Sequence, residues 1–195
     1  MDDSIKSILA REAAGGSVVI RGWLRTVRHS KNVSFLEVTD GSCFSGLQAV
    51  AAPELPEYES CVLELGTGCS VEIEGELVES RGKGQRYEIH ASRVVLVGAA
   101  ADDYPLQKKR HSLEFLRTLG HLRTRTNTLG AVLRVRNAAT VAIHNFFQAQ
   151  GFINLHSPII TLSDAEGAGE MFRVSTLNAE APPRGDDGKV DFSQD

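Results

Sequence analysis

The chain has 195 residues, 42% of them hydrophobic, and a net charge of −4. This is enough for one or two domains with hydrophobic cores, and it excludes a uniformly polybasic nucleic-acid binder. Three cysteines without CxxC spacing argue against a zinc site or a disulfide framework. No run approaches about 20 apolar residues and no secretory signal is visible, so we expect a cytoplasmic protein with no membrane partner.

Short segments rich in β-branched residues, separated by turn signals, fill the first hundred residues. Gly22 lies inside the first of them and indicates a bulge or sharp bend. Five short strands with a helix between the third and fourth are typical of an OB-fold barrel, although other small barrels share this spacing. The patterns predict strands over 17–27, 33–39, 47–51, 70–79 and 87–97, and short helices over 4–13 and 56–65.

The pattern changes in the second half of the chain. Apolar residues recur at helical spacing over 129–150, and Gly151 follows as a candidate C-terminal cap. Residues 152–160 then resemble a strand, whereas 178–195 are polar and cannot supply a core. The predicted divisions are a barrel domain over 1–100, a linker and connecting segment over 101–127, and the start of a second domain over 128–195.

Eight lysines and arginines lie between residues 108 and 136, with only Glu114 against them. Such a basic stretch permits a phosphate or nucleic-acid partner. A solvated basic helix face is an equally good explanation.

Side-chain alternation on the second and third predicted strands defines an outward surface. Leu36 and Val38 fit the barrel interior, so Phe35 points outward, and the same argument turns Gln48 outward. An aromatic ring beside an amide can stack on a base and read its edge. The alternative is that Phe35 packs under a loop and Gln48 is an ordinary surface residue.

The segments Gly22–Lys31 (GWLRTVRHSK) and Phe35–Gly41 (FLEVTDG), followed by Leu47-Gln48, resemble the anticodon-binding domain of aspartyl- and asparaginyl-tRNA synthetases. The resemblance implies that Phe35 stacks on an anticodon base and that Gln48 recognises the central uridine. It also implies that Arg28 and Glu88 contact the anticodon.

The segments Tyr104–Arg117 and His121–Asn127 resemble the beginning of an asparaginyl-tRNA synthetase catalytic domain. The predicted helix over 129–150, with the following segment to Pro158, is similar to the first class II synthetase motif. A helix, a strand and one proline would fit many α/β domains. The resemblance implies a dimer interface at Pro158.

The segment Ser163–Phe172 (SDAEGAGEMF) combines carboxylates with glycines. Carboxylates can bind an ammonium group, and glycines permit close backbone approach. A metal loop is disfavoured because calcium loops need more regular ligands. The resemblance, closer here to asparaginyl than to bacterial aspartyl enzymes, implies that Glu166 holds the amino group of the amino acid, with Ser163 and Gly167 nearby.

Together these resemblances imply a five-stranded OB-fold barrel followed by the start of a class II antiparallel-sheet catalytic domain. The complete enzyme would be a homodimer that attaches asparagine to its tRNA using ATP and Mg²⁺. The later class II motifs, with their ATP-binding arginines, are not found in these 195 residues. We therefore expect no catalytic residue, no metal site, no bound cofactor and no activity from them alone. Two alternatives are an aspartyl-tRNA synthetase, discriminating or not, and a non-catalytic OB-fold RNA-binding module.

Overall fold

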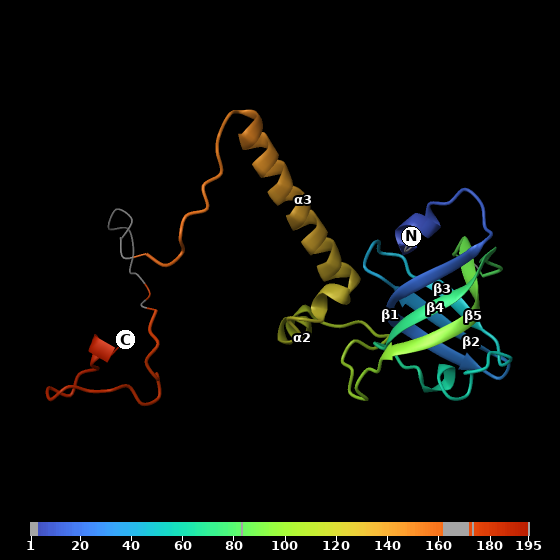
Figure 1. Cartoon of the computed structure of the whole chain (residues 1–195), viewed down its shortest axis with the longest axis horizontal. Coiled ribbons are helices and arrows are strands. Elements are labelled where there is room, and N and C mark those ends of the chain that lie inside the picture. The colour runs from blue at the N-terminus through green and yellow to red at the C-terminus, as the bar shows by residue number, and fades with distance from the viewer. Residues whose placement is uncertain (1–3, 83, 162–171, 173, 195) are drawn as a thin grey trace. The chain divides into compact units, whose positions relative to one another are not determined.

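The computed structural model describes residues 4–82, 84–161, 172 and 174–194 (Figure 1). The chain divides into two compact units, Met1–Ala139 and Thr140–Asp195. None of the helices within the described ranges is long and apolar enough to cross a membrane.

The first unit is built around a closed five-stranded barrel (Figure 1). Around the barrel the strand order is β1-β2-β3-β5-β4, with β4 pairing back onto β1. All pairs are antiparallel except β3 with β5. This is the barrel that the sequence predicts, and its strands are β1 (Ser17–Ser30), β2 (Val33–Thr39), β3 (Leu47–Ala51), β4 (Ser70–Glu79) and β5 (Tyr87–Gly98).

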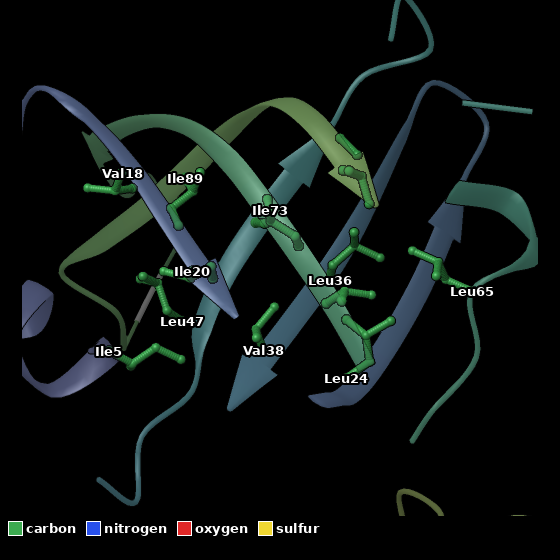
Figure 2. Close-up of a cluster of buried hydrophobic side chains, with 14 of the residues drawn as sticks. Ile5, Val18, Ile20, Leu24, Leu36, Val38, Leu47, Leu65, Ile73 and Ile89 are labelled. Atoms are coloured by element: carbon green, nitrogen blue, oxygen red, sulfur yellow. The ribbon is translucent and has the colours of Figure 1, made fainter. Parts of the chain in front are cut away.

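The barrel interior is filled by alternate residues of the strands. Figure 2 shows the side chains of Leu36 and Val38 from β2 and Leu47 from β3 converging on the enclosed space. These three and Ala49 are at most 1% exposed, which confirms the interior positions inferred from alternation. The outward orientation of their neighbours follows from the same two-residue period.

Helix α1 (Ile5–Leu9) buries Ile5 and Ile8 in the core of the barrel unit. Ser4 caps the helix by accepting a hydrogen bond from the backbone of Ser7. The helix is shorter than the predicted 4–13, and the chain reaches β1 through glycines 15 and 16, both with positive φ.

The sequence suggested a bulge or a sharp bend at Gly22, and the bulge is not found there. Gly22 pairs regularly with Val71 of β4, and the irregularity in the β1–β2 register lies between Leu24 and Thr26. A Cβ at Gly22 would collide with the backbone carbonyl oxygen of Thr39. Gly22 is therefore required because β2 passes too close to β1 for any side chain.

The predicted helix over 56–65 is reduced to a single 3-10 turn, η1 (Val62–Glu64), preceded by hydrogen-bonded turns. Tyr58, Val62 and Leu65 are buried and extend the barrel core. The apolar residues whose spacing suggested a helix are instead buried by turns that pack against the barrel strands.

After the barrel come α2 (Leu113–Thr118), η2 (Arg123–Arg125), α3 (Asn127–Ala149) and η3 (Phe192–Gln194). Helix α3 confirms the long predicted helix, and Gly151 follows it with a φ of 85°. The strand expected over 152–160 does not form, since residues 152–158 have no regular structure. A strand needs a neighbour to hydrogen-bond with, and the residues that the structure describes supply none here.

Candidate nucleic-acid interface

Four residues from four strands lie side by side on the outer face of the barrel. Arg28 of β1 pairs with Phe35 of β2, which pairs with Val50 of β3, which pairs with His90 of β5. The Arg28 guanidinium carbon lies 5.0 Å from the centre of the Phe35 ring. This cation–π contact holds an aromatic ring and a positive charge together at the surface.

The neighbouring row on the same face is polar. Thr26 pairs with Glu37, Glu37 with Gln48, and Gln48 with Glu88. The Thr26 hydroxyl donates a 2.9 Å hydrogen bond to Glu37, and Gln48 Nε2 donates one of 3.3 Å to Glu88. Gln48 therefore lies between two carboxylate-bearing residues.

Glu88 is only 9% exposed although it lies on the outer face. Its Oε2 accepts hydrogen bonds from the Ser80 hydroxyl at 2.8 Å and from Gln85 Nε2 at 3.1 Å. Its Oε1 lies 3.5 Å from His90 Nε2. These contacts tie the β4–β5 turn to β5. Among the described residues, no buried polar side-chain atom lacks a hydrogen-bond partner.

The structure thus brings Arg28, Phe35, Gln48 and Glu88 onto two adjacent rows of one outer face. An aromatic ring, a cation and an amide in this arrangement can stack on a base, neutralise a phosphate and read a base edge. Sequence reasoning missed the partners of Glu88, namely Ser80 and Gln85. The sequence does contain a pattern that could have indicated them: side chains able to donate hydrogen bonds stand on both sides of the β4–β5 turn, close in sequence to the Glu88 carboxylate.

The predicted amino-acid-binding residues Ser163, Glu166 and Gly167 lie outside the described residues. Pro158 is described and is exposed, in the segment without regular structure. Among the described residues no group of three or more His, Cys, Asp or Glu could hold a metal ion.

A hollow of about 1150 Å³ lies elsewhere on the first unit. Trp23 and Arg125 line it, and the Arg125 guanidinium carbon lies 4.5 Å from the centre of the Trp23 ring. Arg125 also donates to the Tyr104 hydroxyl at 3.1 Å, and Arg25 donates to Asn127 at 2.7 Å. The contacts of Arg125 with Trp23 and of Arg25 with Asn127 attach η2 and the first residue of α3 to β1. The side chains that line this hollow therefore pack η2 and the start of α3 against the barrel.

Two family models match the chain. The model described as an OB-fold nucleic acid binding domain matches residues 18–97. The model described as tRNA synthetases class II (D, K and N) matches residues 112–182. The first match covers the barrel strands that carry Arg28, Phe35, Gln48 and Glu88.

Curated relatives match almost the whole chain. An asparagine–tRNA ligase of Geobacter metallireducens is 52% identical over 191 residues, which is 98% of this chain and 41% of the relative. One of Shewanella loihica is 56% identical over 186 residues, covering 94% of this chain and 40% of the relative. The chain therefore spans about two fifths of the length of these relatives.

Solved structures share the fold. The asparaginyl-tRNA synthetase from Pyrococcus horikoshii complexed with asparaginyl-adenylate has a TM-score of 0.75 at 23% identity, covering 90% of this chain and 40% of that one. The aspartyl-tRNA synthetase from Entamoeba histolytica has a TM-score of 0.70 at 20% identity, covering 86% and 41%. At these identities the likeness establishes architecture alone.

Proposed function

We propose that this chain, which is homologous to asparagine–tRNA ligases over nearly its whole length, is the anticodon-binding part and the beginning of the catalytic domain of such an enzyme. The observation that carries the proposal is the outer face of the barrel. There Arg28, Phe35 and Gln48 come together on adjacent rows of a fold whose family model is described as nucleic-acid binding. In this proposal residues 1–100 form the anticodon-binding domain, 101–127 connect, and 128–195 begin the catalytic domain.

The outer face suits an unpaired base. Phe35 offers a ring for stacking, and Arg28 packed against that ring offers charge to the RNA backbone without losing its own stacking partner. Gln48 lies one row away and offers an amide to the Watson–Crick edge of a stacked base. Stacking supplies affinity and the amide supplies base preference.

The complete enzyme would activate asparagine with ATP, release pyrophosphate and transfer the asparaginyl group to the 3′ end of its tRNA. Glu166, with Ser163 and Gly167, would hold the ammonium group of asparagine through opposite charge and hydrogen bonds. The described residues contain no carboxylate cluster that fits Mg²⁺, so no step through that ion is assigned to this chain. An enzyme of translation would work in the cytoplasm.

Helix α3 supports association with a second copy. Its large apolar side chains are exposed, including Val135 at 69%, Ile143 at 58% and Phe146 at 61%. Exposed apolar residues concentrated on one helix indicate a surface that another protein segment covers. We place the homodimer interface here and at the segment that contains Pro158, as the class II resemblance implies.

Binding of asparagine tRNA tests the anticodon role. The 195-residue chain should bind an asparagine tRNA transcript more tightly than the same transcript with its three anticodon bases exchanged. The two RNAs carry the same number of phosphates, so their non-specific electrostatic attraction to the protein is the same. A difference in affinity therefore reports recognition of the anticodon bases. Equal affinities, measured by filter binding at one fixed salt concentration, would exclude anticodon recognition by this chain.

A further inference from the structure

His90 lies on the same outer row as Phe35, two strands away. Phe35 of β2 pairs with Val50 of β3, and Val50 pairs with His90 of β5. Residues directly opposite each other on neighbouring strands point to the same side of a sheet, so all three side chains lie on the outer face. The His90 side chain is 59% exposed. Among the described residues, no other ring and no cation stacks on its imidazole, which leaves the ring available to a ligand.

One edge of the His90 ring is held by the neighbouring polar row. His90 Nε2 lies 3.5 Å from Glu88 Oε1. Glu88 is itself fixed, because its other oxygen accepts hydrogen bonds from Ser80 and Gln85. A ring that is restrained at one edge loses little rotamer freedom when a ligand covers its face. His90 is therefore ordered before any ligand arrives.

The charges around His90 decide which part of an RNA can lie there. Glu88 faces the ring along β5, and the exposed Glu76 of β4 pairs with His90 from the other side. Two carboxylates repel a phosphate, whereas an uncharged base is not repelled. The guanidinium of Arg28 stands at the opposite end of the row, on β1. The β1 end of the row therefore suits the RNA backbone, and the β5 end suits a base.

We propose that His90 is a second stacking platform, which takes a base adjacent to the central anticodon base. This inference rests on the proposed anticodon function and extends the bound RNA by one base. Neighbouring strands are about 4.8 Å apart, so side chains two strands apart are separated by about 10 Å, which is more than one base covers. Val50 lies between the two rings and contributes an apolar side chain to the same surface. The row thus accommodates two unpaired bases, one on Phe35 and one on His90.

The test uses anticodon stem-loops of asparagine tRNA that are intact or lack one base at the first, second or third anticodon position. His90→Ala should weaken binding of the intact loop by about tenfold, the loss expected for one stacked base. The same variant should bind one of the loops without a flanking base as tightly as wild type does, because the contact is already missing there. Phe35→Ala should show this equality only with the loop that lacks the central base.

Three further variants separate stacking from hydrogen bonding and from unrelated effects. His90→Phe keeps an aromatic ring and should retain most of the affinity. His90→Gln keeps a hydrogen-bonding group without a ring and should resemble His90→Ala. His144→Ala removes another exposed histidine, on α3 outside the barrel, and should leave the affinity of every loop unchanged.

Each outcome bears either on this inference or on the function beneath it. Unchanged affinity of His90→Ala for the intact loop overturns the inference, and so does an equal loss for all four loops, since His90 would then act in folding or general binding. Full affinity in His90→Gln with a loss in His90→Phe overturns it too, because the contact would then be a hydrogen bond. In all these cases the equality between wild type and Phe35→Ala at the central position leaves anticodon binding intact. Wild-type protein that binds all four loops equally would remove the proposed function, and this inference with it.

Discussion

At the scale of single residues, the two-residue period of a strand decides which side chains lie on the proposed RNA-binding face. Leu36 and Phe35 are neighbours in sequence, yet one fills the barrel and the other stacks under Arg28 on the outer face. A shift of one residue in β2 would exchange them and place the aromatic ring in the core. The proposed base-binding surface therefore depends on strand register.

Phe35→Ala should weaken binding of asparagine tRNA by about 1–3 kcal/mol, the usual loss of one aromatic–base stack. Phe44→Ala is the matched control. Phe44 is 46% exposed and also has an arginine, Arg134, over its ring at 4.8 Å, but it lies in the loop between β2 and β3. If both variants weaken binding equally in a titration at fixed salt, Phe35 has no special role.

Asp40 accepts a hydrogen bond from the backbone of Ile5 in α1, so the protonation of Asp40 affects how firmly α1 is held to the barrel. Burial raises the pKa of Asp40, but hydrogen bonds from the Ser42 hydroxyl and from the backbone of Ile5 and Ser42 outweigh it and hold this pKa below its ordinary value. The stability that Asp40 contributes is therefore present above the ordinary carboxyl pKa of about 3.9 and is lost as the pH falls through the lowered value.

Asp40→Asn removes this titration. The variant should be less stable than wild type at pH 6, and the gap between the two proteins should narrow by pH 3. Urea unfolding at both pH values measures the difference in free energy of unfolding between the two proteins. The other carboxylates affect both proteins equally, so they do not contribute to this difference. A gap that is the same at pH 3 and pH 6 would show that Asp40 does not titrate with folding.

At the scale of elements, the barrel requires close approach between neighbouring strands as well as buried apolar side chains. Gly22 and Gly75 both lie where an added Cβ would meet a backbone carbonyl oxygen, of Thr39 and His90 respectively. If either pair of strands moved apart to make room for a side chain, β2 or β5 would shift. These two strands carry Phe35 and Glu88 of the proposed RNA-binding rows.

Gly22→Ala should destabilise the protein by about 1–3 kcal/mol through overpacking against β2. Gly66→Ala is the control, since nothing lies within 4 Å of its added Cβ. It should change the free energy of unfolding by less than about 0.5 kcal/mol. Equal denaturant midpoints for the two variants would contradict the close-packing role of Gly22.

The strands, their faces and α3 could be predicted from the sequence because local periodicity determines them. The reason for Gly22 could not, since it depends on Thr39 of another strand. The support of Glu88 by Ser80 and Gln85 depends in the same way on how a hairpin closes. The predicted strand over 152–160 failed because strand formation requires a partner that local sequence does not supply.

At the scale of the whole molecule, stability should be uneven. The barrel unit contains the buried hydrophobic cluster, whereas the residues described beyond 140 are almost all exposed. Segments with few buried apolar contacts open at low free energy. The division into Met1–Ala139 and Thr140–Asp195 therefore predicts two different responses to solvent exchange.

Hydrogen exchange followed by mass spectrometry should show strong amide protection in peptides from 17–98 and weak protection in peptides from 174–194. Peptides from α3 should be intermediate, because the helix is hydrogen-bonded within itself but exposes its apolar side chains. Uniform protection from residue 17 to residue 194 would instead indicate a single cooperative unit.

We propose that an anticodon binds to one outer face of the barrel. Backbone chemical-shift mapping of the labelled 195-residue chain, during titration with an anticodon stem-loop of asparagine tRNA, tests this binding most directly. We expect the largest chemical-shift changes on residues around Arg28, Phe35 and Gln48, and we expect them to disappear with a loop of scrambled sequence. Changes confined to the hollow around Trp23 and Arg125, with none on the rows of Phe35 and Gln48, would contradict it.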